Sequence, residues 1–171
     1  MSLTAASVSG TTGINLRRAG KHLVFALNKE EFGVHALRVR EIMGVQEITQ
    51  LPQAPKHVKG VINLRGKIIP VIDLRNRLGF PKTEYTSRTC IVVLQMECLS
   101  ESALAGIVVD GVSDVLNIAE SDMEDVPALG QCTESACLLG VANIKGQVTL
   151  LLDVDKVLAG SEIYAHGFAT A

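Results

Sequence analysis

The chain has 171 residues and a formal net charge of −2 at pH 7, because 16 lysines and arginines stand against 18 aspartates and glutamates. A nucleic-acid-binding protein needs a basic face that displaces counterions from phosphates, so this balance argues against that class. Aromatic residues make up 4% of the chain and tryptophan is absent, which also argues against a platform for stacking bases. Hydrophobic residues at 47% and charged residues at 20% are typical of a globular fold.

The chain contains no apolar run of the roughly 20 residues that a membrane helix needs. Residues 1–20 are rich in Ser, Thr and Gly without an apolar centre, so we expect a flexible N-terminal tail rather than a secretory signal. The absence of a C-x2-C pair predicts reduced thiols and no metal site at Cys90, Cys98, Cys132 and Cys137. We therefore expect a cytoplasmic protein without direct membrane insertion.

Short runs rich in β-branched residues, bounded by glycines or charged breaks, predict strands along the whole chain. In order they are His22–Leu27, Phe32–Ala36, Ile68–Ile72, Cys90–Met96, Ala105–Val109 and Val148–Leu152. The runs Ile68–Ile72 and Val148–Leu152 are continuously apolar, which predicts strands covered on both faces. Pro70 has no N–H to donate, so its strand should lie at a sheet edge or be bulged there.

Two short segments begin after an aspartate and end at a glycine. Asp73 precedes Leu74–Leu78, and Asp153 precedes Val154–Leu158. A carboxylate before the first turn and a glycine after the last predict a capped one-turn helix in each place. Two such helices among many short strands predict an all-β fold.

An internal repeat joins these elements. Gly60–Leu78 and Gly140–Leu158 align without gaps at an offset of 80, and six of nineteen positions are identical. Upstream, Leu23–Leu27 matches Ile91–Gln95 in its apolar pattern. Two copies are too few for a solenoid, so the repeat predicts two pseudo-symmetric small barrels. The first repeat would run from about 21 to 80 and the second from about 88 to 160, and whether they intertwine is left open.

Glycines in the repeat mark predicted turns. Gly66 and Gly146 each fall between two apolar runs, where a hairpin needs a residue that tolerates positive φ. Arg65 precedes the first of these glycines and should project from a hairpin tip. It is then either a solvated turn residue or an interface anchor, and the residues alone leave both readings open.

The segment Gly60–Lys67 carries the glycines and lysine of a phosphate-binding loop, which would suit a nucleotide-binding enzyme. That loop needs four residues between its glycines and a Ser or Thr after the lysine, whereas here five intervene and Ile68 follows. The four histidines lie far apart and no nucleophile elbow occurs, so no catalytic or metal-binding residue is predicted.

Four segments closely resemble the CheW family of chemotaxis coupling proteins. They are KGVINLRGKIIPVIDLRNRLG at 59–79, LVFALNKEEFGVHALRVREIM at 23–43, AGIVVDGVSDVLNI at 105–118 and LGVANIKGQVTLLLDVDKVL at 139–158. The resemblance implies two five-stranded SH3-like barrels with an apolar core between them. It also implies one CheW-like domain over residues 21–160, with a C-terminal tail at 161–171.

The resemblance implies a non-catalytic adaptor without a cofactor. Such a protein couples methyl-accepting chemotaxis receptors to the histidine kinase CheA, is recruited to membrane-associated receptor arrays and is monomeric in isolation. Coupling in a type IV pilus or other non-flagellar chemosensory system is an open alternative.

Family motifs also imply binding residues. A receptor-facing groove should include Val39, Glu41, Arg65, Cys90 and Val112, with Ile42 and Met43 as neighbours. A kinase-facing surface at one barrel end should include Leu37, Gly44 and Val45. Two segments depart from the family pattern: residues 97–103 suggest a longer hairpin loop, and residues 121–138 do not align.

Overall fold

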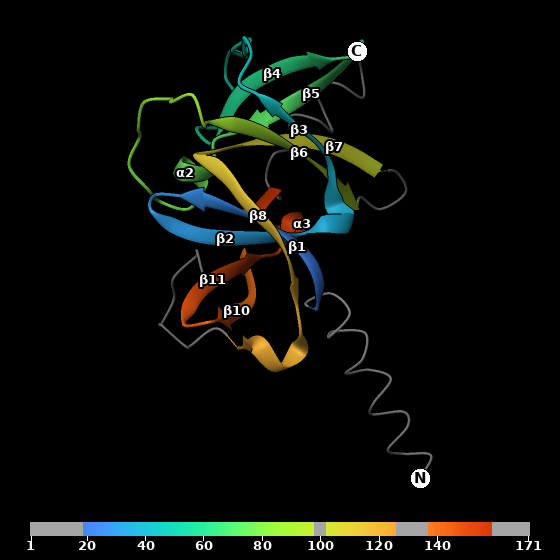
Figure 1. The fold of residues 1–171 in the computed structure, drawn as a ribbon. Coiled ribbons are helices and arrows are strands. Elements are labelled where there is room, and N and C mark those ends of the chain that lie inside the picture. Colours follow the sequence, from blue (N-terminus) through green and yellow to red (C-terminus); the bar gives the residue numbers. More distant parts are fainter. Residues whose placement is uncertain (1–18, 98–101, 126–136, 159–171) are drawn as a thin grey trace.

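The computed structural model describes residues 19–97, 102–125 and 137–158, and these residues form short strands and very short helices (Figure 1). The elements are β1 (Gly20–Leu27), β2 (Glu30–His35), η1 (Ala36–Arg38), β3 (Val39–Gly44), β4 (Val58–Leu64), β5 (Lys67–Ile72), α2 (Leu74–Arg77), β6 (Cys90–Glu97), β7 (Ser102–Val109), β8 (Gly111–Ile118), η2 (Glu120–Asp122), β9 (Met123–Glu124), β10 (Leu138–Ile144), β11 (Gln147–Leu152) and α3 (Val154–Leu158). None of the helices in these segments is long and apolar enough to cross a membrane. The predicted all-β class is confirmed.

The strands form two sheets, which we call barrel A and barrel B. Barrel A has the strand order β8-β1-β2-β11-β10-β9, and barrel B has the order β3-β6-β7-β5-β4. In Figure 1 barrel B lies above barrel A, and both sheets curl strongly. The predicted pair of five-stranded SH3-like barrels is confirmed, with the two-residue strand β9 added to barrel A.

Each barrel takes strands from both sequence repeats. Strand β3 of the first repeat pairs with β6 of the second, and β8 of the second repeat pairs with β1 of the first. Parallel pairings between β2 and β11 and between β5 and β7 join the repeats again. The two repeats are therefore intertwined.

Equivalent backbone contacts recur at the offset of 80. The N–H of Asp73 donates to the carbonyl of His57 at 2.6 Å, and the N–H of Asp153 donates to that of Cys137 at 2.7 Å. Both aspartates cap their helices, because each Oδ1 accepts a backbone N–H three residues later at 3.2 Å. The predicted capped helices are confirmed.

The two hairpin tips share one turn geometry. Gly66 has φ of 84° and Gly146 has φ of 82°, so the predicted positive φ is confirmed at both glycines. The preceding residues Arg65 and Lys145 also have positive φ, at 51° and 53°. Two successive positive φ values define the turn that matches the twist of a two-residue hairpin.

The predicted upstream alignment is wrong by one residue. Val39 pairs with Leu94 and Val112 pairs with Phe25, so Phe25 corresponds to Leu94 rather than to Val93. A shift of one residue exchanges the two faces of a strand. The corrected register puts both Phe25 and Leu94 in the main core, while Val93 faces the interior of barrel B.

Two other local expectations are also corrected. Strand β5 lies inside its sheet, but its pairing with β7 covers only Val71 and Ile72, so the missing N–H of Pro70 interrupts no β7 bond. Ile68 and Val148 are 44% and 53% exposed. They lie at the starts of β5 and β11, where each strand extends beyond the region that the other strands of its barrel cover. The hairpin loop predicted at 97–103 lies mostly outside the described residues, since β6 runs to Glu97 and β7 begins at Ser102.

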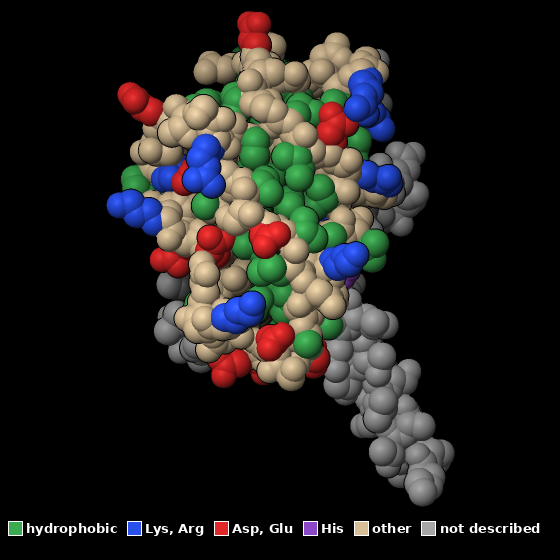
Figure 2. Space-filling model, viewed as in Figure 1, with side chains coloured by type: hydrophobic (Ala, Val, Ile, Leu, Met, Phe, Trp, Pro, Cys, Tyr) green, Lys and Arg blue, Asp and Glu red, His purple; other side chains and the backbone are tan. Residues whose placement is uncertain are grey.

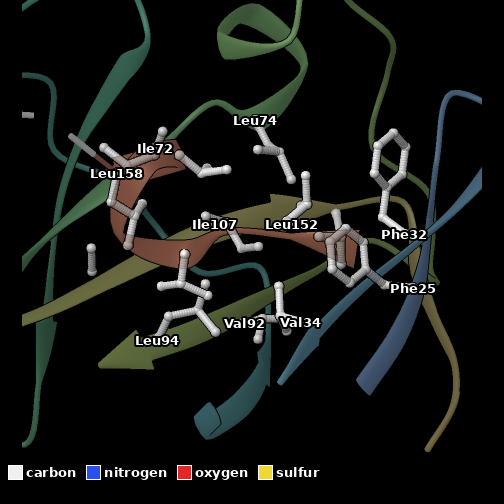
Figure 3. Packing of buried hydrophobic residues seen from close by; sticks show 14 of the residues in the cluster. Phe25, Phe32, Val34, Ile72, Leu74, Val92, Leu94, Ile107, Leu152 and Leu158 are labelled. Atoms are coloured by element: carbon white, nitrogen blue, oxygen red, sulfur yellow. The ribbon is translucent and has the colours of Figure 1, made fainter. Parts of the chain in front are cut away.

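The main hydrophobic core lies between the barrels. Figure 3 shows side chains of both repeats pointing toward one another there, among them Phe25, Leu74, Ile107 and Leu152. These four side chains are each no more than 2% exposed. This shared core packs the two barrels against each other.

The interiors of the two barrels differ in chemistry. Barrel B is filled by aliphatic residues that include Ile69, Ile91 and Val108. By the corrected register, the equivalent positions in barrel A are Thr149, His22 and His35.

The two histidines of barrel A form a close pair. The rings of His22 and His35 lie 5.1 Å apart. His22 is 1% exposed, its Nδ1 lies 3.0 Å from the carbonyl oxygen of Gly20, and its Nε2 is buried without a hydrogen-bond partner. Burial lowers the pKa of His22, the hydrogen bond to Gly20 opposes this, and the charge of His35 adds to it.

We expect stability to fall in mild acid partly through His22. Because the folded state lowers the pKa of His22 below its unfolded value of about 6.5, its neutral ring is favoured by folding. This contribution is complete above about pH 6.5 and is lost as the pH falls toward the folded pKa. In His22→Ile, which copies barrel B, urea unfolding should therefore show a smaller loss of stability between about pH 7.5 and 5.5. An unchanged loss would contradict this assignment, whereas a residual loss is expected from His57, whose pKa burial also lowers.

Gly60 is expected to tolerate no side chain. Its φ is 151°, and an added Cβ would lie 2.1 Å from the carbonyl oxygen of Thr49. That oxygen cannot easily move, because it accepts a hydrogen bond from the N–H of Val61. Gly60→Ala should lower the free energy of unfolding by at least about 2 kcal/mol, measured by urea denaturation. Gly44→Ala is the matched control, because an added Cβ there meets nothing within 4 Å. Similar losses in both variants would refute the steric explanation.

Candidate partner-binding surface

Two edge strands border an apolar band between the barrels. Strand β3 is an edge of barrel B and β8 is an edge of barrel A. Their first apolar residues, Val39 and Val112, are half-buried and pack against the main core. Figure 2 shows hydrophobic side chains gathered in the centre of this face, with acidic and basic side chains around them. The shared core thus reaches the surface between β3 and β8, and these two strands are equivalent to each other in the repeat.

Cys90 begins β6 beside this band. It is 9% exposed and forms a hydrogen bond with the backbone of Val112. Burial raises the pKa of the Cys90 thiol, and the hydrogen bond from Val112 opposes that rise. The thiol is therefore protonated at neutral pH and contributes as a small apolar group.

Charge borders the band on the barrel B side. Arg65 at the β4–β5 hairpin tip lies 2.8 Å from Glu41 of β3, measured from Nη2 to Oε1. The Arg65 side chain is 78% exposed, whereas that of Glu41 is 26% exposed. Much of the guanidinium therefore remains accessible for a partner, while Glu41 orients it.

The equivalent hairpin of barrel A lacks this ion pair. By the repeat, Lys145 corresponds to Arg65 and Asp114 to Glu41. Within residues 19–97, 102–125 and 137–158, no salt bridge joins Lys145 to Asp114; an oxygen of Asp114 instead accepts the N–H of Val115. The two equivalent hairpins therefore carry the same signs of charge but differ in how the charged side chains are paired.

Comparison with known proteins identifies the family. The model of the CheW-like domain matches residues 21–162. The chain belongs to the CheW-like family. A chemotaxis protein CheW of Rhizobium meliloti is 36% identical over 86% of this chain and 94% of its own length. One from Klebsiella aerogenes is 35% identical over 82% of each chain.

A solved structure supports the same assignment. The scaffolding protein TtCheW of Thermoanaerobacter tengcongensis superposes with a TM-score of 0.73 and 31% identity, over 82% of this chain and 93% of that one. The predicted family resemblance is confirmed, and this CheW-like chain is a scaffold rather than an enzyme.

The structure brings together most of the residues that the CheW resemblance assigns to receptor binding. Glu41 meets Arg65, Cys90 meets Val112, and Val39 packs on the same core as Val112. Their role in binding stays a prediction.

The predicted kinase-facing residues do not form one patch. Leu37, in η1, is 84% exposed and lies before β3, whereas Gly44 and Val45 lie at the far end of that strand. Six residues of extended chain separate these sites by roughly 20 Å. Only an interface that extends along β3 could include all three residues, and their role in kinase binding stays a prediction.

Of the four exposed aliphatic side chains on the described strands, only Ile42 is predicted from the sequence as a candidate contact residue. They form two repeat-related pairs with exposed fractions near one half: Ile42 with Val115, and Ile68 with Val148. The signal that could have found Ile68 and Val148 is their place directly after a hairpin turn, where a strand projects beyond its barrel.

The nucleotide-binding alternative for Gly60–Lys67 is wrong. The segment forms β4, a tight turn and the start of β5, with register pairs from Gly60–Val71 to Leu64–Lys67. A phosphate-binding loop instead leaves its backbone N–H groups free between a strand and a helix. No cluster of three or more metal-binding side chains occurs in the described part of the chain.

Removing the exposed ion pair should cost little stability. Arg65→Ala keeps a non-glycine residue at the same positive φ and removes a salt bridge that is mostly in solvent. The free energy of unfolding should fall by no more than about 1 kcal/mol in urea denaturation. A larger loss would mean that Arg65 supports the fold rather than presenting a surface.

Proposed function

We propose that the protein is a chemotaxis adaptor that couples methyl-accepting receptors to the histidine kinase CheA. The observation that carries this proposal is the apolar band bordered by the exposed guanidinium of Arg65, in a chain of the CheW-like family. Arginine is enriched at interface hot spots because its planar fork binds carboxylates in two-point contacts.

The receptor would bind along the band between β3 and β8. Val39, Cys90 and Val112 would supply apolar contact, and Arg65 with Glu41 would supply the charged rim. Because these residues lie on strands or on a tight hairpin, binding would cost little backbone ordering.

The kinase would contact a second surface. Leu37 at one end of β3 is 84% exposed, which supports it as an apolar contact, and Gly44 with Val45 would contribute at the other end. Two modest interfaces on one rigid body suit a receptor array, where high effective concentration turns weak contacts into stable assembly. The adaptor would be cytoplasmic, monomeric in isolation and recruited to such arrays, with residues 21–160 as its functional domain.

Charge reversal at Arg65 tests the receptor interface. In membranes that contain receptors and CheA, Arg65→Glu should weaken receptor binding at least about tenfold and reduce receptor-dependent kinase autophosphorylation. Lys145→Glu is the matched control, because Lys145 occupies the equivalent hairpin position with nearly the same φ.

The two variants distinguish a specific role of Arg65 from a general effect of added negative charge. The proposal predicts a loss in Arg65→Glu alone, with both variants retaining the wild-type melting temperature. Unchanged kinase regulation in Arg65→Glu, or an equal loss in Lys145→Glu, would refute the assignment of Arg65.

A further inference from the structure

A cleft opens at the mouth of barrel B, outside the receptor and kinase residues discussed above except for Val45. Its volume is about 660 Å³, within the range of clefts that bind ligands or several side chains. Its walls come from two segments without regular structure, one between β3 and β4 and the other between α2 and β6. Two of its lining residues are chain neighbours of elements that border the apolar band, because Val45 follows β3 and Thr89 precedes Cys90.

The floor of the cleft is aliphatic. Val45 and Ile48 are half-buried and pack on the interior of barrel B, and Val58 and Val108 are buried beneath. Tyr85 stands at the side with 44% of its surface exposed. An occupant therefore needs apolar side chains to cover this floor.

The rim of the cleft carries excess positive charge. Four cations and two carboxylates line it: Lys56, Lys59, Arg75 and Lys82, with Asp73 and Asp110. Both carboxylates already have partners, since Asp110 meets Arg75 at 2.6 Å and Asp73 caps α2 and lies 3.8 Å from Lys59. Among the described residues, Lys56 and Lys82 take part in no salt bridge.

We propose that this cleft binds an acidic peptide segment of a partner protein that also carries aliphatic side chains. Carboxylates spread along such a segment complement the separated lysines on the rim, while its aliphatic residues cover the floor. A compact phosphate fits less well, because the Asp73 carboxylate already occupies the capping position at the start of α2 and repels a second anion there.

Lys59 provides a further contact for a carboxylate. Its ammonium lies 5.2 Å from the centre of the Tyr85 ring and at a long 3.8 Å from Asp73, so neither neighbour holds it tightly. An incoming carboxylate can therefore bind Lys59 without breaking a short ion pair.

The test uses a short fluorescein-labelled peptide in which Glu and Leu are interspersed with Ser, measured by fluorescence anisotropy. We expect binding that weakens as salt rises. The double variant Lys56→Glu, Lys82→Glu should bind at least about tenfold more weakly. The control double variant Lys145→Glu, Lys156→Glu has the same net charge and exposed sites outside the cleft, so its affinity should match the wild type.

A second measurement locates the peptide. In amide chemical-shift mapping, the changes should concentrate at residues 45–59 and 82–89. The proposal is overturned if the wild type does not bind the peptide, if a peptide with Lys in place of Glu binds equally, if both double variants lose affinity alike, or if the shifts fall on barrel A. The assay contains neither receptor nor kinase, so its outcome is independent of the coupling role.

Discussion

Strand exchange between the two sequence repeats is the constraint on which the remaining structure depends. Because β3 pairs with β6 and β8 pairs with β1, neither repeat completes a sheet from its own strands. The exchange also places β3 and β8 at sheet edges, on either side of the shared core. The apolar band that we assign to receptor binding is therefore a direct consequence of the pairing.

Arginine contacts reinforce the junction that this exchange creates. Each joins a residue of the first repeat to the second: Arg38 binds Asp155 through two hydrogen bonds of 3.0 and 2.7 Å, and Arg75 binds Asp110 at 2.6 Å. Arg77 donates to the backbone carbonyl of Val157 at 3.1 Å, at the end of α3. These groups are partly exposed, so each contact contributes modestly to stability. The planar guanidinium groups nevertheless give these contacts between the repeats a defined orientation.

The repeated backbone supports different chemistry in its two halves. One hairpin tip carries the Arg65–Glu41 pair, and its equivalent carries Lys145 without that pairing. One interior is aliphatic, and the other contains His22 against His35. A scaffold needs distinct surfaces for distinct partners, and a duplicated fold supplies two similar frameworks whose side chains diverge separately. The cationic cleft beside β3 extends this asymmetry, because its lysines lie in segments outside the aligned repeat.

Features that depend on residues close together in the chain could be predicted from the sequence alone. The all-β class, the two capped helices and the hairpin glycines follow from short patterns, because capping and turn geometry are decided within a few residues. The exposed position of Arg65 follows from the same turn. Only the tertiary structure decided the strand exchange, the one-residue correction that aligns Phe25 with Leu94, and the distance between Leu37 and Gly44. Strand partners lie far apart in the chain, and their pairing depends on which apolar faces meet in the shared core, which no local pattern encodes.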